Sequence, residues 1–419
     1  MTPQQIAGLE GELTRYLERF DDCFGRSEPR GHLAVYVRGQ LSDLRRKSVE
    51  PIALEAGVAP RTLQKFLAWS KRDHGKLRDR VQQIVASEHC SGEGVLIVDE
   101  TSHKKKGDKT PGVQRQHCGS TGKIDNCVVT VHIAYSEPTS GFRTLLDSDL
   151  FLPENGWDDA ARRAAAHIPE DVVYRPKHVI AIEEIDRALA NGVRFGWVTA
   201  DEGYGGKGPF IEALEKRELP FVLEMPRNTW GWFIAPLTVA GDGPKRIDNL
   251  CRHSDQINRQ PWVKCHVKDT EKGPIVWEHR AQRFWMRRDG RIRGPYLLIH
   301  ARNVLCPGEE KYFLVKAPET TRAEHGLKIG FSRFPIERSF QDGKSELGLS
   351  HYEGRSHRGL IRHCHVTAMT HLFLARQTER LRGKKTGGLD SPSPQGRRRS
   401  GLLSQLRPRR TPATLRQGG

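Results

Sequence analysis

Apolar residues recur along the chain with two different spacings, which divide it into a helical first part and an α/β second part. Up to about residue 90 they follow helical spacing, as in Ile6, Leu9, Leu13, Tyr16, Leu17 and Phe20. From Gly92 they gather in short runs that predict buried strands, namely Val95–Val98, Val128–Tyr135, Gly196–Ala200 and Phe221–Met225. A helical stretch, Val179–Leu189, lies between the second and third runs. Strands that alternate with helices predict an α/β core behind an N-terminal helical region.

Residues 51–67 have the pattern of a helix-turn-helix. Gly57 provides a tight turn, and Pro60 stands in the first turn of the second helix, a position that suits proline. The side chains that this second helix would present to DNA are Arg61, Gln64 and Lys65. An ordinary helical hairpin fits the same pattern, and the basic context favours the DNA-binding interpretation.

Two of the apolar runs end on an aspartate. Asp99 follows Val98, and Asp201 follows Ala200. An acid at the end of a buried strand, facing a basic surface, suits a divalent cation held against a polyanion. Either aspartate alone could simply cap a turn, but the repetition favours a carboxylate site. Lys104 and Lys105, just beyond the first aspartate, are candidate DNA contacts, with a solvated charge run as the alternative.

Residues 227–315 interrupt the alternation with further strand patterns and predict a β-rich insertion. Five of the eight tryptophans lie here, among basic residues, and such aromatic side chains can stack on unpaired bases. Trp230 and Trp232, which we expect in a loop, are the better candidates for base contacts. The other three, Trp262, Trp277 and Trp285, are expected to form the small core of the insertion.

Helical pattern returns after about residue 334. Pro335 suits the first turn of a helix, and Glu337 and Lys344 lie seven residues apart on one face. Arg333 stands just before this helix. A later helix, Leu360–Leu381, is apolar on one side and is expected to pack on the sheet. From about residue 383 the chain is rich in Gly, Pro, Ser and Arg, which predicts a disordered basic tail that adds affinity for phosphates.

Composition narrows the class of protein. The chain has 419 residues, a formal net charge of +17 and a pI near 9.7, which favours nucleic acid as the partner. No apolar run approaches the length of a membrane span, and the N-terminus lacks a signal-peptide core, so we expect a cytoplasmic protein. None of the eight cysteines forms a C-x-x-C pair, which argues against zinc ribbons and predicts buried free thiols.

These residues together resemble the bacterial insertion-sequence transposases of the DDE superfamily, in the subgroup with a Tyr-x2-Arg-x3-Glu-x6-Lys signature. Arg333, Glu337 and Lys344 match that spacing, whereas Gly330 stands where the signature has tyrosine. The resemblance spans about residues 30–380. It implies an α/β fold with an RNase H-like mixed sheet, flanking helices, a β-rich insertion and an N-terminal helical DNA-binding domain. The expected divisions are 1–90 for DNA binding, 91–226 and 316–382 for the catalytic core, 227–315 for the insertion and 383–419 for the tail.

The resemblance also implies a chemistry. Asp99, Asp201 and Glu337 would form a catalytic triad that holds two Mg²⁺ ions, with Mn²⁺ able to substitute. Asp99 would bridge the ions, and the other two acids would each hold one. Arg333 and Lys344 would hold phosphates beside them. The implied substrates are the inverted repeats at the ends of the element and a target duplex, paired by a homodimer on DNA. The implied location is the nucleoid in the cytoplasm of a bacterium.

Alternatives remain for both the site and the function. Glu346 and Glu353 compete with Glu337 for the role of third acid. Instead of a transposase, the chain could be a domesticated DNA-binding regulator without catalysis. A third possibility is an RNase H-like endonuclease that cuts DNA but does not join it.

Overall fold

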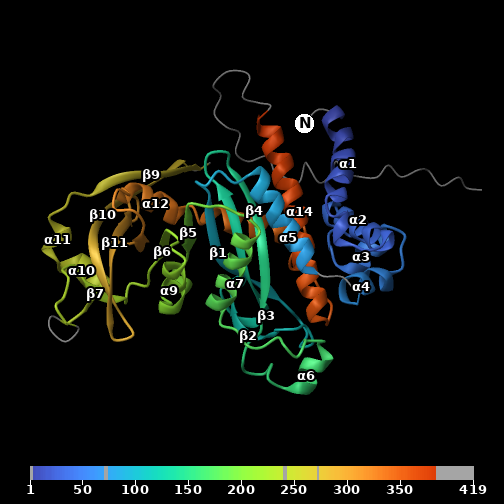
Figure 1. Cartoon of the computed structure of the whole chain (residues 1–419), viewed down its shortest axis with the longest axis horizontal. Coiled ribbons are helices and arrows are strands. Elements are labelled where there is room, and N and C mark those ends of the chain that lie inside the picture. Colours follow the sequence, from blue (N-terminus) through green and yellow to red (C-terminus); the bar gives the residue numbers. More distant parts are fainter. Residues whose placement is uncertain (1–2, 70–73, 239–242, 271–272, 384–419) are drawn as a thin grey trace, which may run out of the picture.

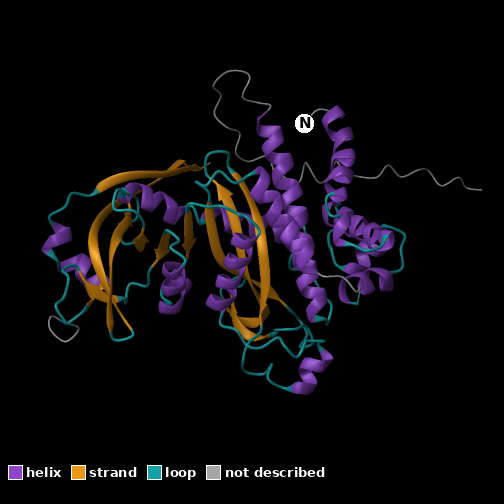
Figure 2. Ribbon diagram, in the orientation of Figure 1, coloured by secondary structure: helices purple, strands orange, loops and turns teal. Residues whose placement is uncertain are grey.

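The computed structural model describes residues 3–69, 74–238, 243–270 and 273–383. Figures 1 and 2 show an elongated molecule, with helices at one end and a continuous run of strands reaching the other. The predicted basic tail lies outside the described residues, apart from residue 383. Within the described ranges, no helix is both long and apolar enough to cross a membrane.

Five helices and one short 3-10 turn make up the N-terminal region. The helices are α1 (Pro3–Glu18), α2 (Ser27–Leu41), α3 (Val49–Glu55), α4 (Pro60–Ala68) and α5 (His74–Glu88), and the 3-10 turn is Asp21–Cys23. Between α3 and α4, Gly57 adopts a positive φ of 67°, and the Val58 amide donates to the Ala53 carbonyl across 2.9 Å. The two predicted helices and the turn between them are therefore present, and glycine adopts this backbone conformation without strain. An ordinary helical hairpin has the same elements, so the DNA-binding interpretation stays a prediction.

The central sheet is mixed. Its strands are β1 (Val95–Lys104), β2 (Gln114–Cys118), β3 (Lys123–Glu137), β4 (Phe142–Phe151), β5 (Trp197–Ala200) and β6 (Phe221–Glu224). β4, β3 and β1 pair antiparallel, whereas β1, β5 and β6 run parallel to one another. Helix α7 (Lys177–Ala190) connects the two halves and packs on β3 and β4. The predicted α/β core is therefore confirmed.

The predicted β-rich region continues this same sheet. Its strands are β7 (Trp230–Trp232), β8 (Lys245–Arg246), β9 (Val263–Thr270), β10 (Gly273–Arg288), β11 (Arg291–Asn303) and β12 (Glu310–Lys316). Strand β12 pairs antiparallel with β6, so the backbone hydrogen bonds run from the central strands into the insertion without a break. The expected boundary at residue 315 falls inside β12.

The remaining helices cover the sheet and its ends. They are α6 (Ala160–Ala165), α8 (Glu202–Gly205), α9 (Gly208–Lys216), α10 (Ile247–His253), α11 (Asp255–Asn258), α12 (Ala323–Phe331), α13 (Phe334–Ser345) and α14 (His357–Gly383). Figure 1 shows α14 running between the sheet and helices α1 to α4, and α5 lies beside α14 and also contacts β4.

Helix α14 corrects one prediction. We expected a single apolar side, but every residue from 361 to 375 is buried. The second side is covered because the N-terminal helices pack on it: the Tyr16 hydroxyl donates to the Met369 carbonyl at 2.7 Å, and Tyr36 bonds to His363 at 2.9 Å. Polar residues on that side are hydrogen-bonded into the helical region instead of facing water.

The cysteines partly follow the prediction. All eight thiols are free, and most are buried, but Cys306 is exposed and Cys90 is half-buried.

Candidate active site

Asp99 and Asp201 are neighbours because of strand register. β1 and β5 run parallel, with Val98 paired to Ala200, and each aspartate is the residue that directly follows this pair. Adjacent strands lie about 4.8 Å apart, which brings the two carboxylates to the same edge of the sheet. One detail differs from the prediction: β1 does not end at Asp99 but continues to Lys104, because β3 keeps pairing with it after β5 has stopped.

The carboxylate of Asp99 is held on both oxygens. Its Oδ1 accepts from the Glu100 amide at 2.8 Å, and its Oδ2 accepts from Arg333 at 3.1 Å. Only 8% of the residue is exposed. Burial raises the pKa of Asp99 to about 7, against the opposing effect of the Arg333 charge, since desolvation penalises the ionised form.

Asp201 caps a short helix. Its Oδ1 accepts from the amides of Gly203 at 2.9 Å and Tyr204 at 3.3 Å, at the start of α8. Its Oδ2 lies 4.0 Å from the Arg333 guanidinium. The alternative role as a turn cap is thus real, but it occupies one oxygen and leaves the other directed toward the site.

Arg333 joins these aspartates to Glu337. It stands at the N-cap of α13, and Glu337 lies one turn further along, with its Oε1 3.5 Å from the same guanidinium. Asp99, Asp201 and Glu337 come from segments more than a hundred residues apart, and each contacts this single side chain. Glu337 is the most solvent-exposed of the three carboxylates.

The donor atoms suit a hard divalent cation, because carboxylate oxygens are the ligands that Mg²⁺ prefers. When all three carboxylates are ionised, the single guanidinium leaves an excess of two negative charges. In the arrangement seen here, however, no three acidic, histidine or cysteine side chains of the described chain are placed closely enough to hold a metal ion. The Arg333 guanidinium stands between the carboxylates. The ligand atoms of the site therefore suit a metal ion, but the present distances between the carboxylates accommodate the arginine side chain instead.

The predicted lysines lie in different surroundings. Lys344 is half-buried and donates to the Ser102 carbonyl at 3.1 Å, on the strand that carries Asp99. Lys104 is exposed and pairs with Asp125 at 2.7 Å. Lys105 turns inward and donates to the carbonyls of Ser350 and Tyr352 at 3.2 and 2.5 Å. Because its ammonium group is hydrogen-bonded to these two backbone carbonyls, we do not retain Lys105 among the proposed DNA contacts.

The two competitors for the third acid lie apart from Arg333. Glu346 stands at the C-terminal end of α13, nine residues beyond Glu337, which is about 13 Å along the helix. Glu353 forms an ion pair with Arg46 of the N-terminal region. Neither has a contact with Arg333, so Glu337 is the candidate that the geometry favours.

The helix-turn-helix candidates are solvent-accessible. Arg61, Gln64 and Lys65 are exposed on α4, while Leu63 and Phe66 of the same helix are buried.

The two tryptophans predicted to contact bases, Trp230 and Trp232, differ from each other in exposure. Both lie in strand β7 instead of the expected loop, and Trp230 is 49% exposed whereas Trp232 is 6% exposed. Residues two apart in a strand share one face, so alternation does not separate the two rings. Their strand neighbours differ: Trp232 is paired with Trp285 of the long strand β10, whereas Trp230 is paired with Arg246 of the two-residue strand β8. The burial of Trp232 argues against it as a base contact.

Lys268 is a site residue that the sequence did not indicate. It belongs to β9 of the insertion, and its ammonium lies 3.0 Å from the centre of the Phe334 ring at the start of α13. The charge of Glu337 raises its pKa, although burial dominates and the net pKa is lowered. No local pattern marks this lysine, because only the folding of β9 back over α13 brings it to the site.

Comparison with known proteins agrees with this geometry. Residues 19–282, more than half of the chain, match the model of the DDE superfamily endonuclease family. The chain belongs to that family, and its mixed sheet with flanking helices is the RNase H-like fold that the sequence predicted. The matched range contains Asp99 and Asp201 and ends before Glu337.

A curated relative points in the same direction. The chain is 31% identical over 192 residues to a protein of Microchaete diplosiphon described as a probable transposase for insertion sequence element IS701. The alignment covers 45% of this chain and 47% of the relative, so the chain spans about half the length of the curated protein it matches.

Proposed function

We propose that the chain is a DNA transposase that cuts phosphodiester bonds at the ends of its element and joins the freed 3′-hydroxyl to a target duplex. The observation that carries this proposal is the shared contact of Asp99, Asp201 and Glu337 with one guanidinium. Membership in the DDE superfamily endonuclease family and the similarity to a probable transposase support it.

In this proposal Asp99, Asp201 and Glu337 would hold two divalent cations, Mg²⁺ or Mn²⁺. Such ions would activate the attacking water or hydroxyl and stabilise the departing oxygen. The buried position of Asp99 would keep bulk water away from one side of a phosphate bound there. Arg333 would leave the carboxylates for a phosphate oxygen, an exchange that suits its planar, bidentate guanidinium.

The rest of the DNA would be held outside the carboxylate site. Arg61, Gln64 and Lys65 are exposed on the second helix of the helix-turn-helix and would bind the terminal inverted repeats. Lys344, Lys104 and Trp230 would contact the strand near the cut. Synapsis of two element ends calls for at least two protomers, and we propose a homodimer on DNA.

The decisive experiment incubates the protein with a duplex that carries the element's end in Mg²⁺ or Mn²⁺. We expect a nick or break at the end, and its loss in Asp99→Ala, Asp201→Ala and Glu337→Ala with DNA binding retained. Joined products with a target duplex would identify a transposase, and cutting without joining would indicate a plain endonuclease. Binding of the wild-type protein without any cutting would overturn the proposal in favour of a DNA-binding regulator.

A further inference from the structure

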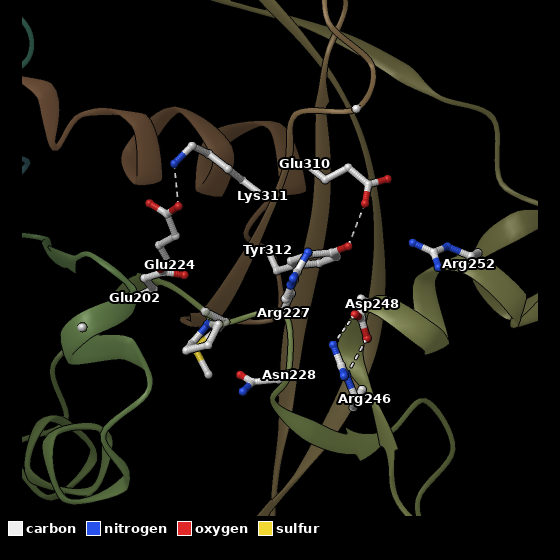
Figure 3. Close-up of a pocket in the computed structure, with 14 residues that line it drawn as sticks. Glu202, Glu224, Arg227, Asn228, Arg246, Asp248, Arg252, Glu310, Lys311 and Tyr312 are labelled. Carbon is white, nitrogen blue, oxygen red and sulfur yellow. Dashed lines mark hydrogen bonds and ion pairs between the residues drawn. The ribbon is translucent and has the colours of Figure 1, made fainter. Parts of the chain in front are cut away.

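A cavity of about 720 Å³ lies beside the carboxylate site, between the central strands and the insertion. On one side it is lined by Glu202 of α8 and by the segment that follows β6. On the other it is lined by the start of β12 and by α10, as Figure 3 shows. Its volume falls within the range usual for ligand sites, and it is open to solvent.

The cavity continues the sheet edge that carries the acids. β5 and β6 run parallel, with Ala200 paired to Leu223, so Glu224 stands beside Asp201. Arg227 follows three residues later, at most about 10 Å from Glu224. A polynucleotide strand leaving a phosphate at the carboxylates therefore reaches Arg227 within a few nucleotides.

Most charges that line the cavity are already paired. Lys311 pairs with Glu224, Arg246 pairs with Asp248 at 2.6 Å, and the Tyr312 hydroxyl donates to Glu310 at 2.9 Å. These pairs are drawn in Figure 3.

Two guanidinium groups differ from the rest. The side chains of Arg227 and Arg252 form no hydrogen bond or ion pair with any described residue, and both are exposed. In Figure 3 Arg227 lies in the middle of the group of lining residues, and Arg252 points from α10 toward that group. Unpaired arginines that converge on a cavity are typical of a site for phosphate groups.

We propose that this cavity binds one strand of the DNA next to the phosphodiester at the carboxylates, with Arg227 and Arg252 each contacting a backbone phosphate. The inference rests on the proposed function, which supplies DNA as the substrate. Glu202, the lining carboxylate nearest Asp201 in the sequence, disfavours a phosphate at its own end and directs the backbone toward the arginines. The insertion would thereby hold the strand whose phosphate the central strands present for cutting.

The test measures binding on a protein that cannot cut. We use the Asp99→Asn protein and a fluorescein-labelled 15-nucleotide thymidine strand, and follow its anisotropy as a function of KCl concentration. Arg227→Gln with Arg252→Gln should weaken binding and reduce the log–log salt slope by about 1.4, since each phosphate contact on single strands contributes about 0.7. The thermal midpoint should stay unchanged, because neither side chain has a hydrogen-bond or ion-pair partner among the residues that the structure describes.

The matched control is Arg259→Gln with Arg283→Gln. Both arginines are exposed in the insertion, lie outside the cavity and pair with other acids. This variant removes the same charge and should keep the salt slope. An equal loss in the control, or an unchanged slope in the cavity variant, would overturn the inference. So would efficient competition by thymidine monophosphate, which would indicate a mononucleotide site. Failure of the wild-type protein to cut DNA would count against the proposed function alone, because binding is measured on the inactive protein.

Discussion

The Arg333 guanidinium donates to Asp99 Oδ2 at 3.1 Å, and it also stands within 4.0 Å of Asp201 and Glu337. A protein cation therefore neutralises part of the charge of the three carboxylates. It occupies the space between them, where a divalent cation would have to bind. Arginine and metal consequently compete for the same oxygens.

Replacing Arg333 with glutamine should strengthen metal binding in the absence of DNA. A positive charge within 4 Å of the ligands is worth several kcal/mol even at an effective dielectric constant near 20, so the affinity should rise by about tenfold or more. The measurement is Mn²⁺ binding by electron paramagnetic resonance. Arg338→Gln is the control, since Arg338 lies on the same helix and pairs with Asp342. Equal Mn²⁺ affinity in the Arg333 variant and wild type would rule out the competition.

Glu337→Ala should lower DNA cleavage by roughly 100-fold or more, because an acid next to the reacting phosphate is removed. Glu346→Ala and Glu353→Ala should cut within a few-fold of wild type, since neither acid contacts Arg333. Cleavage of a labelled duplex end is measured for all three variants, with DNA affinity determined alongside. Normal cleavage by Glu337→Ala together with loss in one of the others would transfer the role of third acid to that residue.

Lys104 and Lys105 are adjacent but should respond differently to truncation. Lys105→Ala removes the donor to two carbonyls and should cost about 2 kcal/mol of unfolding free energy. Lys104→Ala should leave stability nearly unchanged, because its ion pair with Asp125 is exposed. Urea unfolding of both variants compares these effects. Equal stability of the two variants would contradict the inward placement of Lys105.

The same lysine predicts a pH dependence. Burial lowers the pKa of Lys105 to about 8, whereas a lysine in the unfolded chain titrates near 10.4. Between these values the unfolded chain binds more protons, so the unfolding free energy of wild type should rise with pH relative to Lys105→Met. The difference should grow by up to about 1.4 kcal/mol per pH unit above pH 8 and stay flat below it. Urea unfolding of both proteins at pH 7 to 9.5 measures this difference in free energy. A difference that does not change with pH would refute the lowered pKa of Lys105.

Trp230 and Trp232 form a second matched pair. Trp230→Ala should weaken DNA binding by about 1–3 kcal/mol, the usual value of one stacked base, with little effect on stability. Trp232→Ala should instead destabilise the fold by about 3–5 kcal/mol, because the ring is buried beside β10. Affinity and thermal unfolding are measured on both proteins. Unchanged DNA affinity in Trp230→Ala would remove this residue from the interface.

Local patterns in the sequence were sufficient to predict most helices and strands and to single out two of the acids, Asp99 and Asp201. Apolar runs predicted β1, β3, β5 and β6, because a strand buried on both faces needs consecutive apolar residues. The position of Asp201 directly after such a run placed it correctly at the end of β5, whereas Asp99 lies inside β1, which continues to Lys104. Gly57, Pro60 and Pro335 marked helix boundaries through their own backbone restrictions, which act within a few residues.

Only the tertiary structure decided which of these residues have partners and what the partners are. Periodicity reports that a side of an element is apolar or polar, but it carries no information about the distant segment that covers it. For this reason the sequence did not reveal that α14 is buried on both sides or that Lys105 points inward. It also did not reveal that Trp232 is buried whereas Trp230 is exposed. The placement of Arg333 among three carboxylates, and of Lys268 above α13, depends on contacts between segments far apart in the chain, which no local spacing encodes.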